Sequence, residues 1–294
     1  MVKAGFSDGR QRYKCKDCNK RFIPHKSLDG YKLYDAYLNG KQTLEQLSFQ
    51  NKVSVRTIQR KLEKVEAVDL PAFGKSVVIL MDTSYWGRDF GVVAFKDVYS
   101  KLVIWHKFIY RKERLADYFE GIEQVGRMGY AIQGVVCDGM PGLIKALSHL
   151  RVQYCQFHMV KTVRSKLTKS PKSDAGRDLL QVVCLMAHTD KESFVGYLAI
   201  WYDTYEAYLN ERSEPDSNGH THYMHKRLRS AYLGIKRNME YLWTWYDNID
   251  LRIPNTNNGI EALFTDLKSK LRVHNGLSLK NREKFISQYF RTAH

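Results

Sequence analysis

The sequence predicts a mixed α/β fold, in which a strand-forming segment is followed by a long all-helical one and preceded by two small N-terminal units. Short apolar runs typical of buried strands gather between residues 75 and 160. Residues 161–252 are rich in Leu, Tyr, Trp, Lys and Arg and contain no convincing strand. The chain has 294 residues, 44% of them hydrophobic, which suffices for one large domain with one or two small ones.

The charge of the chain favours an acidic partner. Lys and Arg total 47 against 31 Asp and Glu, a formal net charge of +16. Such an excess attracts polyanions, of which nucleic acid is the commonest, although a solvated basic surface is the plainer alternative. No apolar run approaches the roughly 18 residues that cross a bilayer, and no signal segment opens the chain. With five cysteines and no disulfide framework, we expect a cytoplasmic protein with no membrane partner.

Residues 1–26 look like part of a zinc ribbon. Cys15 and Cys18 form a CxxC, which is half of the four-ligand set that structural Zn²⁺ requires. The other half is not evident, and His25 is a single candidate. Either the chain begins inside a ribbon whose first knuckle is missing, or the CxxC is only a turn, so Zn²⁺ at this pair is one of two interpretations.

Residues 27–70 show helical periodicity in short pieces. The first piece ends at Asn39-Gly40, and Thr43 and Ser54 are the expected N-caps of the next two. Two short helices with a tight turn and a basic second helix are typical of a helix-turn-helix, whereas a three-helix packing unit is the alternative. The residues of the third helix expected to contact DNA are Arg56, Thr57, Gln59, Arg60 and Lys61.

The next segment, residues 75–160, has the element order of an RNase H-like sheet. The expected elements are strands over 76–82, 91–97, 101–110, 131–137 and 151–154, with helices over 113–128 and from Pro141. This order (strand, strand, strand, helix, strand, helix, strand) is that of the first part of an RNase H-like core. Residues 161–252, with a polar loop at 212–225, then form a helical insertion, and residues 253–294 return to the core as helix.

Two aspartates mark the ends of buried strands. If the strands that precede Asp82 and Asp138 are parallel neighbours, both side chains emerge at the carboxyl edge of the sheet, where ligands bind in open α/β sheets. Adjacent carboxylates share a proton or coordinate a cation, and hard oxygen ligands suit Mg²⁺ or Mn²⁺. Taken singly, each aspartate is equally well explained as a loop or cap residue.

A third carboxylate opens the last helical segment. Polar capping residues precede a helix near Asn258, whose apolar stripe leaves Glu261 on an adjoining face with Lys268 and Arg272. Such a helix can present Glu261 to the two aspartates and lay Lys268 and Arg272 along a DNA backbone. An amphipathic surface helix with mixed charges is the alternative.

In these motifs the chain resembles the DDE transposases of bacterial insertion sequences, closest to the Mutator-like group. The order and spacing of the motifs, 138 − 82 = 56 residues and 261 − 138 = 123 residues, carry this resemblance over nearly the whole chain. A Cys-x-x-His pair after the second aspartate, here Cys155 and His158, is a mark of the group, as is a helical insertion before the glutamate. The matching segments are Met-Asp82-Thr-Ser-Tyr-Trp-Gly, Val-Cys-Asp138-Gly-Met-Pro-Gly, Tyr-Cys155-Gln-Phe-His158, Thr-Asn-Asn-Gly-Ile-Glu261-Ala-Leu-Phe and Leu-Lys268-Ser-Lys-Leu-Arg272.

The resemblance implies a catalytic core in which Asp82, Asp138 and Glu261 hold two Mg²⁺ or Mn²⁺ ions and DNA is cleaved and joined. It implies double-stranded DNA as the partner, both the element's terminal repeats and the target, and at least a dimer on DNA. Cys155 and His158 are expected to be structural or DNA-proximal rather than a zinc site. Trp86 either stacks on a base or packs in the core.

Two alternatives keep the same fold. A metal-dependent nuclease would cut DNA without joining it, and a transposase-derived DNA-binding protein would do neither. The three carboxylates argue against the second alternative, whereas a missing ribbon knuckle would fit a truncated copy. A phosphatase acting on small molecules would leave the charge of +16 unexplained.

Overall fold

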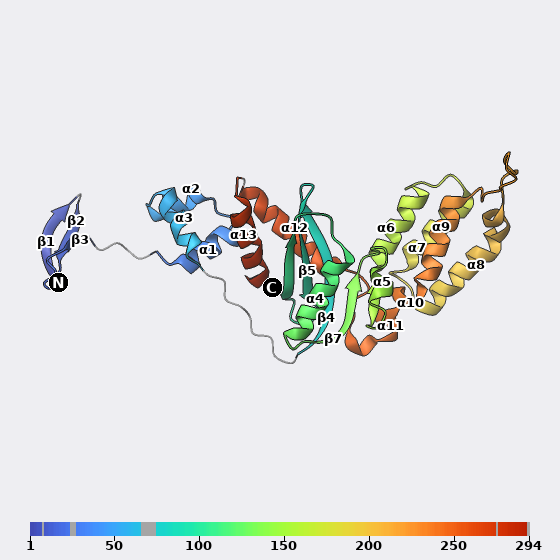
Figure 1. The fold of residues 1–294 in the computed structure, drawn as a ribbon, viewed down its shortest axis with the longest axis horizontal. Coiled ribbons are helices and arrows are strands. Elements are labelled where there is room, and N and C mark those ends of the chain that lie inside the picture. Colours follow the sequence, from blue (N-terminus) through green and yellow to red (C-terminus); the bar gives the residue numbers. More distant parts are fainter. Residues whose placement is uncertain (8, 24–27, 66–74, 275, 293–294) are drawn as a thin grey trace. The chain divides into compact units, whose positions relative to one another are not determined.

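The computed structural model describes residues 1–294 except 8, 24–27, 66–74, 275 and 293–294 (Figure 1). The chain divides into two compact units. The first comprises Met1–Val68 with Lys270–Gly276, and the second comprises Asp69–Ser269 with Leu277–His294. In the part of the chain so described, no helix is long and apolar enough to cross a membrane.

The first unit begins with a three-stranded antiparallel sheet of β1 (Val2–Ser7), β2 (Arg10–Lys14) and β3 (Arg21–Phe22). The CxxC forms the turn between β2 and β3, where the N–H of Cys15 donates to the carbonyl of Lys20 over 2.9 Å. Backbone N–H groups of Cys18 and Asp17 lower the pKa of the Cys15 thiol, which favours the thiolate that metals bind. His25 lies outside the described residues, and zinc binding stays a prediction.

Three helices complete the first unit: α1 (Gly30–Leu38), α2 (Leu44–Asn51) and α3 (Val55–Glu63). Both predicted caps are confirmed. Thr43 and Gln46 form a reciprocal capping box, and the Ser54 hydroxyl accepts the N–H of Thr57 over 3.2 Å. Residues from the far end of the chain belong to this unit, because buried His274 contacts the carbonyl of Tyr37 over 3.0 Å.

The second unit contains a five-stranded mixed sheet in the order β6-β5-β4-β7-β8. The strands are β4 (Ser76–Trp86), β5 (Phe90–Asp97), β6 (Val103–Ile109), β7 (Ala131–Cys137) and β8 (Val152–Tyr154). β4, β7 and β8 are parallel, whereas β4, β5 and β6 form an antiparallel meander. This arrangement is compatible with the RNase H-like core expected from the sequence.

Several predicted boundaries differ from the structure, and two of the differences have a clear physical cause. β4 does not end at Asp82 but runs to Trp86, because β5 continues to pair with it as far as Trp86 opposite Phe90. The helix expected from Pro141 begins only at Leu143, as the short α5 (Leu143–Ala146), because Gly142 has a φ of 83°, which a right-handed helix excludes.

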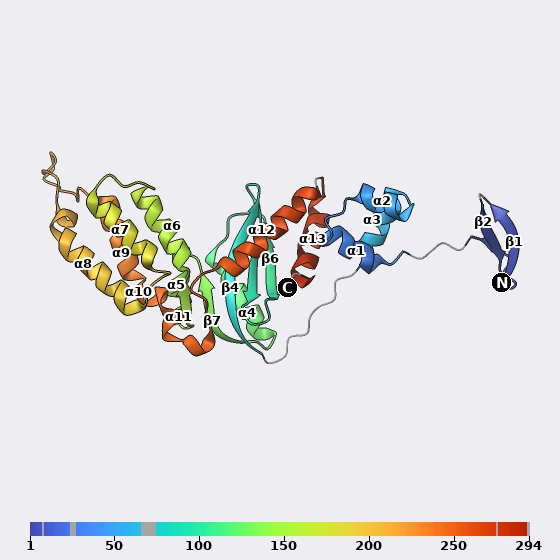
Figure 2. The same cartoon turned by 180° about the vertical axis from the view of Figure 1, so that it is seen from behind.

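Helices cover both faces of the sheet. α4 (Leu115–Arg127) packs on the face that carries Ile79 and Met81, and Gly121 is needed there because a Cβ would come within 2.5 Å of Phe95. α12 (Asn258–Val273) and α13 (Leu279–Thr292) cover the opposite face. Figure 1 shows α4 in front of the sheet, and Figure 2, from behind, shows α12 in front of it.

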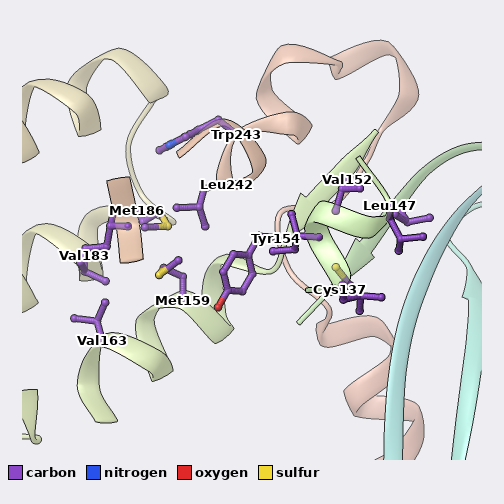
Figure 3. Close-up of a cluster of buried hydrophobic side chains, with 14 of the residues drawn as sticks. Cys137, Leu147, Val152, Tyr154, Met159, Val163, Val183, Met186, Leu242 and Trp243 are labelled. Atoms are coloured by element: carbon purple, nitrogen blue, oxygen red, sulfur yellow. The ribbon is translucent and has the colours of Figure 1, made fainter. Parts of the chain in front are cut away.

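The predicted helical insertion is present. Its elements are α6 (Gln156–Leu167), α7 (Asp174–Leu185), α8 (Lys191–Asn210), α9 (Lys226–Arg237), α10 (Met239–Leu242), α11 (Thr244–Asp247) and the 3₁₀ helix η1 (Ile249–Leu251). It begins at Gln156 rather than at residue 161, and the polar loop at 212–225 holds an isolated bridge from Arg212 to Tyr223. Figure 3 shows one core passing from Cys137 through Tyr154 and Met159 to Trp243, so sheet and insertion share it.

Candidate active site

The sheet places the two predicted aspartates side by side. Leu80 of β4 pairs with Val136 of the parallel strand β7, and Asp82 and Asp138 each lie two residues beyond this pair. Because side chains alternate along a strand, Asp82 shares the face of Leu80, which α12 covers. The expectation that the two strands are parallel neighbours is therefore confirmed.

One oxygen of each aspartate is already held by the backbone. The N–H of Thr83 donates to Oδ1 of Asp82 over 2.8 Å, and the N–H of Met140 donates to Oδ1 of Asp138 over 3.1 Å. Neither Oδ2 atom has a hydrogen bond within the described ranges. In each side chain a backbone N–H thus orients Oδ1, and Oδ2 is available to a ligand.

Glu261 lies in the first turn of α12, which is tied to β4 just before it. The side-chain amide of buried Asn257 donates to the carbonyl of Met81 over 2.7 Å, next to Asp82 in the chain. Lys96 donates to the carbonyl of Gly259 over 3.1 Å. Gly259 allows this close approach, since a Cβ there would lie 2.9 Å from Leu80.

The Cys-x-x-His pair also contacts the segment that carries Glu261. The buried thiol of Cys155 accepts the N–H of Asn257 over 3.2 Å, and Nε2 of His158 lies 3.5 Å from Oε1 of Glu261. Both residues are on the strand-to-helix turn where α6 begins. The motif therefore contacts both the start of α12 and the glutamate, and its structural or DNA-proximal role stays a prediction.

The carboxylates share one electrostatic environment. Burial is the largest cause that raises the pKa of Asp82 to about 7, with smaller contributions from the charges of Asp138, Glu261 and Glu113 and against the lowering effect of the Thr83 N–H. Asp82 is therefore partly protonated at neutral pH. A cation placed among these groups would favour the ionised form.

The donor set suits a divalent metal ion. The candidate ligands are carboxylate oxygens, and Oε1 of Glu261 is buried with no hydrogen-bond partner in the part of the chain that the structure describes. The three carboxylates are not close enough together to bind one ion as they are. Among the described residues, no group of three or more His, Cys, Asp or Glu side chains could hold a metal ion.

Sequence reasoning missed Glu113, a fourth carboxylate beside the site. Its Oε2 accepts the hydroxyl of Tyr118 over 2.7 Å, and the Tyr118 and Thr83 hydroxyls lie 2.9 Å apart. Its N–H donates to the Tyr85 hydroxyl over 2.7 Å. An acidic residue just before a helix is ordinarily read as an interaction with the helix dipole, so no signal in the sequence pointed to the site.

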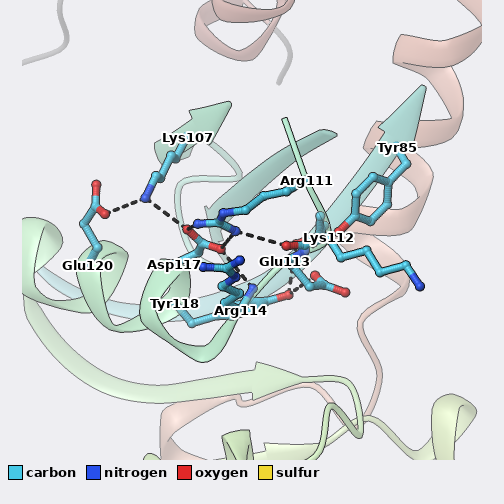
Figure 4. Close-up of polar contacts among 10 residues, drawn as sticks. Tyr85, Lys107, Arg111, Lys112, Glu113, Arg114, Asp117, Tyr118 and Glu120 are labelled. Atoms are coloured by element: carbon cyan, nitrogen blue, oxygen red, sulfur yellow. Dashed lines mark hydrogen bonds and ion pairs between the residues drawn. The ribbon is translucent and has the colours of Figure 1, made fainter. Parts of the chain in front are cut away.

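A buried aspartate fixes the turn that carries Glu113. Asp117, fully buried, accepts two hydrogen bonds from Arg111 over 2.7 and 2.9 Å, one from Lys107 over 3.0 Å and one from the N–H of Arg114 over 2.9 Å (Figure 4). The Arg111 guanidinium holds the pKa of Asp117 well below its usual range. The cluster joins β6 to the first turn of α4.

The residues predicted to contact DNA are accessible to different degrees. On α3, Arg56, Gln59 and Arg60 are exposed, and Thr57 and Lys61 are half-buried. On α12, Arg272 is exposed, and half-buried Lys268 places Nζ 5.9 Å from the Trp86 ring. Trp86 is half-buried and 5.8 Å from the ring of Phe90. DNA contact by these residues stays a prediction.

We expect Asn257→Ala to weaken the fold by about 2 kcal/mol, because the buried Met81 carbonyl loses its donor. The start of α12 would also no longer be fixed beside Asp82. Urea denaturation followed by circular dichroism measures the first effect. The control is Asn258→Ala at the exposed neighbouring position. Equal stability of the two variants would contradict the role of Asn257.

Comparisons with known proteins give little beyond this geometry. No family model matches the chain, and no curated protein matches it. Among solved structures, the chain is similar to the Drosophila P element transposase strand transfer complex, with a TM-score of 0.32 and 13% sequence identity. The match covers 86% of this chain and 66% of that chain, slightly under two thirds of its length. A similarity this low carries no argument about function.

Proposed function

We propose that the protein is a DDE transposase of a bacterial insertion sequence, of the Mutator-like group, with Asp82, Asp138 and Glu261 as its catalytic carboxylates. One observation carries the proposal. Residues far apart in the chain approach one another at one edge of the sheet, where the charges of Asp138 and Glu261 both act on the half-buried Asp82. The net charge of +16 supports DNA as the substrate.

Two divalent ions held by Asp82, Asp138 and Glu261 would activate the attacking oxygen and stabilise the leaving one. The chain's own residues would hold and orient these three carboxylates. Thr83 and Met140 fix the two aspartates, and Asn257 with Cys155 fixes the start of α12. His158, beside Glu261, helps to set the position of that carboxylate.

No side chain is needed as a covalent nucleophile. Water attacks the phosphodiester at the element's end, the bond to the 3′ oxygen breaks, and a 3′-hydroxyl is released. That hydroxyl then attacks a phosphodiester of the target, joins to its phosphorus and displaces the target's own 3′ oxygen. The three helices of the first unit would hold the terminal repeats through Arg56, Gln59 and Arg60.

A strand-transfer assay tests the proposal. Duplexes that end in the sequences flanking the gene are incubated with target DNA and Mg²⁺ or Mn²⁺. We expect joined product from the wild type and a loss of roughly a thousandfold or more in Asp82→Ala, Asp138→Ala and Glu261→Ala. The matched control is Asp89→Ala, an exposed carboxylate in the turn after β4.

The reaction products distinguish a transposase from a nuclease and from a DNA-binding protein. Cut DNA without joined product would indicate a nuclease of the same fold. DNA binding with neither product would indicate a binding protein and overturn catalysis. Equal loss in the Asp89 variant would show that the site had been assigned wrongly.

A further inference from the structure

The helical insertion carries its charges unevenly. No acidic residue lies between Asp138 and Asp174, a stretch that includes α6, or between Asp216 and Glu240, a stretch that includes α9. α7 and α8 carry both signs. The cations on and beside α6 and α9 are Lys161, Arg164, Lys166, Lys169, Lys172, Lys226, Arg227, Arg229, Lys236 and Arg237.

The two acid-free helices are neighbours. Nζ of Lys166 on α6 donates to the carbonyl and the hydroxyl of Ser230 on α9, over 3.0 and 2.8 Å, and Figures 1 and 2 show the two helices side by side. Lys161, Arg164, Lys236 and Arg237 are exposed. We name the cations Lys161, Arg164, Lys166, Lys236 and Arg237 of these two helices the α6–α9 basic face. At its two sides, Arg164 also donates to Sγ of Cys184 on α7 over 3.3 Å, and Nζ of Lys236 lies 6.0 Å from the Tyr202 ring on α8.

The cations of this face are not held in ion pairs by the part of the protein that the structure describes. None of its five cations has a carboxylate partner within the described ranges. On the same bundle, Arg177 of α7 pairs with Asp174, and Lys191 of α8 pairs with Asp247 over 2.6 Å. Burial, and then the charge of Arg237, lower the pKa of Lys166, as expected where cations crowd. A merely solvated surface of a mixed-charge protein would have anions interspersed.

The face begins at the candidate active site. His158, on the first turn of α6, lies 3.5 Å from Glu261, and Lys161 follows one turn later. With its 12 residues α6 is about 18 Å long, which is the rise of about five base pairs of duplex DNA. Phosphates along such a duplex are spaced closely enough to meet cations on successive turns of the helix.

We propose that the α6–α9 basic face binds the phosphate backbone of duplex DNA beside the cleaved bond. The position of that bond rests on the proposed function, whereas the binding itself does not. The partner is identified by charge and length, because a row of cations without carboxylate partners along two neighbouring helices matches a polyanion of regular spacing. The contacts are to phosphates, so the binding is independent of base sequence.

The test measures binding of the full chain to a fluorescent 30-base-pair duplex by anisotropy over a series of salt concentrations. A chelator is present, so that no cleavage occurs. The face variant combines Lys161→Ala, Arg164→Ala and Arg237→Ala. The control combines Arg127→Ala, Arg177→Ala and Lys191→Ala, which removes the same charge from cations that have carboxylate partners.

We expect the slope of log affinity against log salt to fall by about 2 to 3 in the face variant, since each phosphate contact contributes about 0.9. Affinity at roughly 0.1 M salt should fall about tenfold or more, and the control should keep the slope of the wild type. Equal slopes in the face variant and the control overturn the proposal. A loss confined to single-stranded DNA shows that duplex is the wrong partner.

The two proposals can fail separately. If the slope falls in the face variant but the wild type neither cuts nor joins DNA, DNA binding by the face is supported and the proposed function is refuted. If the wild type joins DNA while the face variant keeps its slope, only the face is refuted. Circular dichroism of the variants, whose changed residues are exposed except for the half-buried Lys191, checks that they are folded.

Discussion

Asp82→Asn is expected to abolish DNA cleavage and joining and yet to stabilise the folded protein at pH 8. The carboxyl has a pKa of about 7 in the folded chain against an ordinary 3.8, so ionising it in place costs free energy. Its contribution to stability is fully present below pH 3.8 and is lost as the pH rises through about 7. Because asparagine does not ionise, we expect the free energy of unfolding at pH 8 to rise by an amount on the order of 2–4 kcal/mol.

Urea denaturation of the wild type and of Asp82→Asn, in chelator at pH 8 and again near pH 4, measures this difference. The gain should shrink at the lower pH, where the aspartate is protonated in the folded state and partly protonated in the unfolded state. Divalent metal should stabilise the wild type more than the variant, because a ligand that binds only the folded state raises its stability. A variant less stable than the wild type at pH 8 would refute this account. Asp89→Asn, at an exposed position, serves as the control.

Asp117→Ala is expected to destabilise the folded protein by about 3 kcal/mol. The substitution leaves Arg111 and Lys107 without their shared anion and the N–H of Arg114 without an acceptor. Because both cations are partly exposed, water offsets some of the loss. The pKa of Asp117 is depressed, so its contribution is present above pH 3.8 and is lost as the pH falls below that value.

Thermal and urea denaturation at pH 7 measure the effect of Asp117→Ala. Glu120→Ala is the matched control, since Glu120 is an exposed partner of the same Lys107 and should contribute less than about 1 kcal/mol. A similar loss of stability in both variants would show that the burial of Asp117 does not strengthen its contribution to the stability of the fold.

The sequence predicts those parts of the structure that local patterns determine. Apolar runs located the strands, and the capping residues Thr43 and Ser54 located two helix starts, because periodicity and caps act within a few residues. The adjacency of Asp82 and Asp138 followed from one topological rule about parallel strands.

The remaining features depend on partners distant in the chain. β4 is longer than predicted because of its pairing with β5, which no apolar pattern within β4 reveals. Asn257 fixes α12 through Met81 and Cys155, which lie 176 and 102 residues away. Glu113 lies near Asp82 through a tertiary contact, because its carboxylate accepts the hydroxyl of Tyr118, which lies 2.9 Å from the hydroxyl of Thr83. The roles of these residues follow from tertiary contacts and not from local sequence.

The participation of residues 270–276 in the first unit affects when that unit can form during synthesis. His274 reaches the carbonyl of Tyr37 across 237 residues of chain. At about 5–20 residues per second, a ribosome needs roughly ten to fifty seconds to make that length. The N-terminal helices therefore emerge long before the segment that completes them, and this contact closes only after the sheet and the helical insertion have left the ribosome.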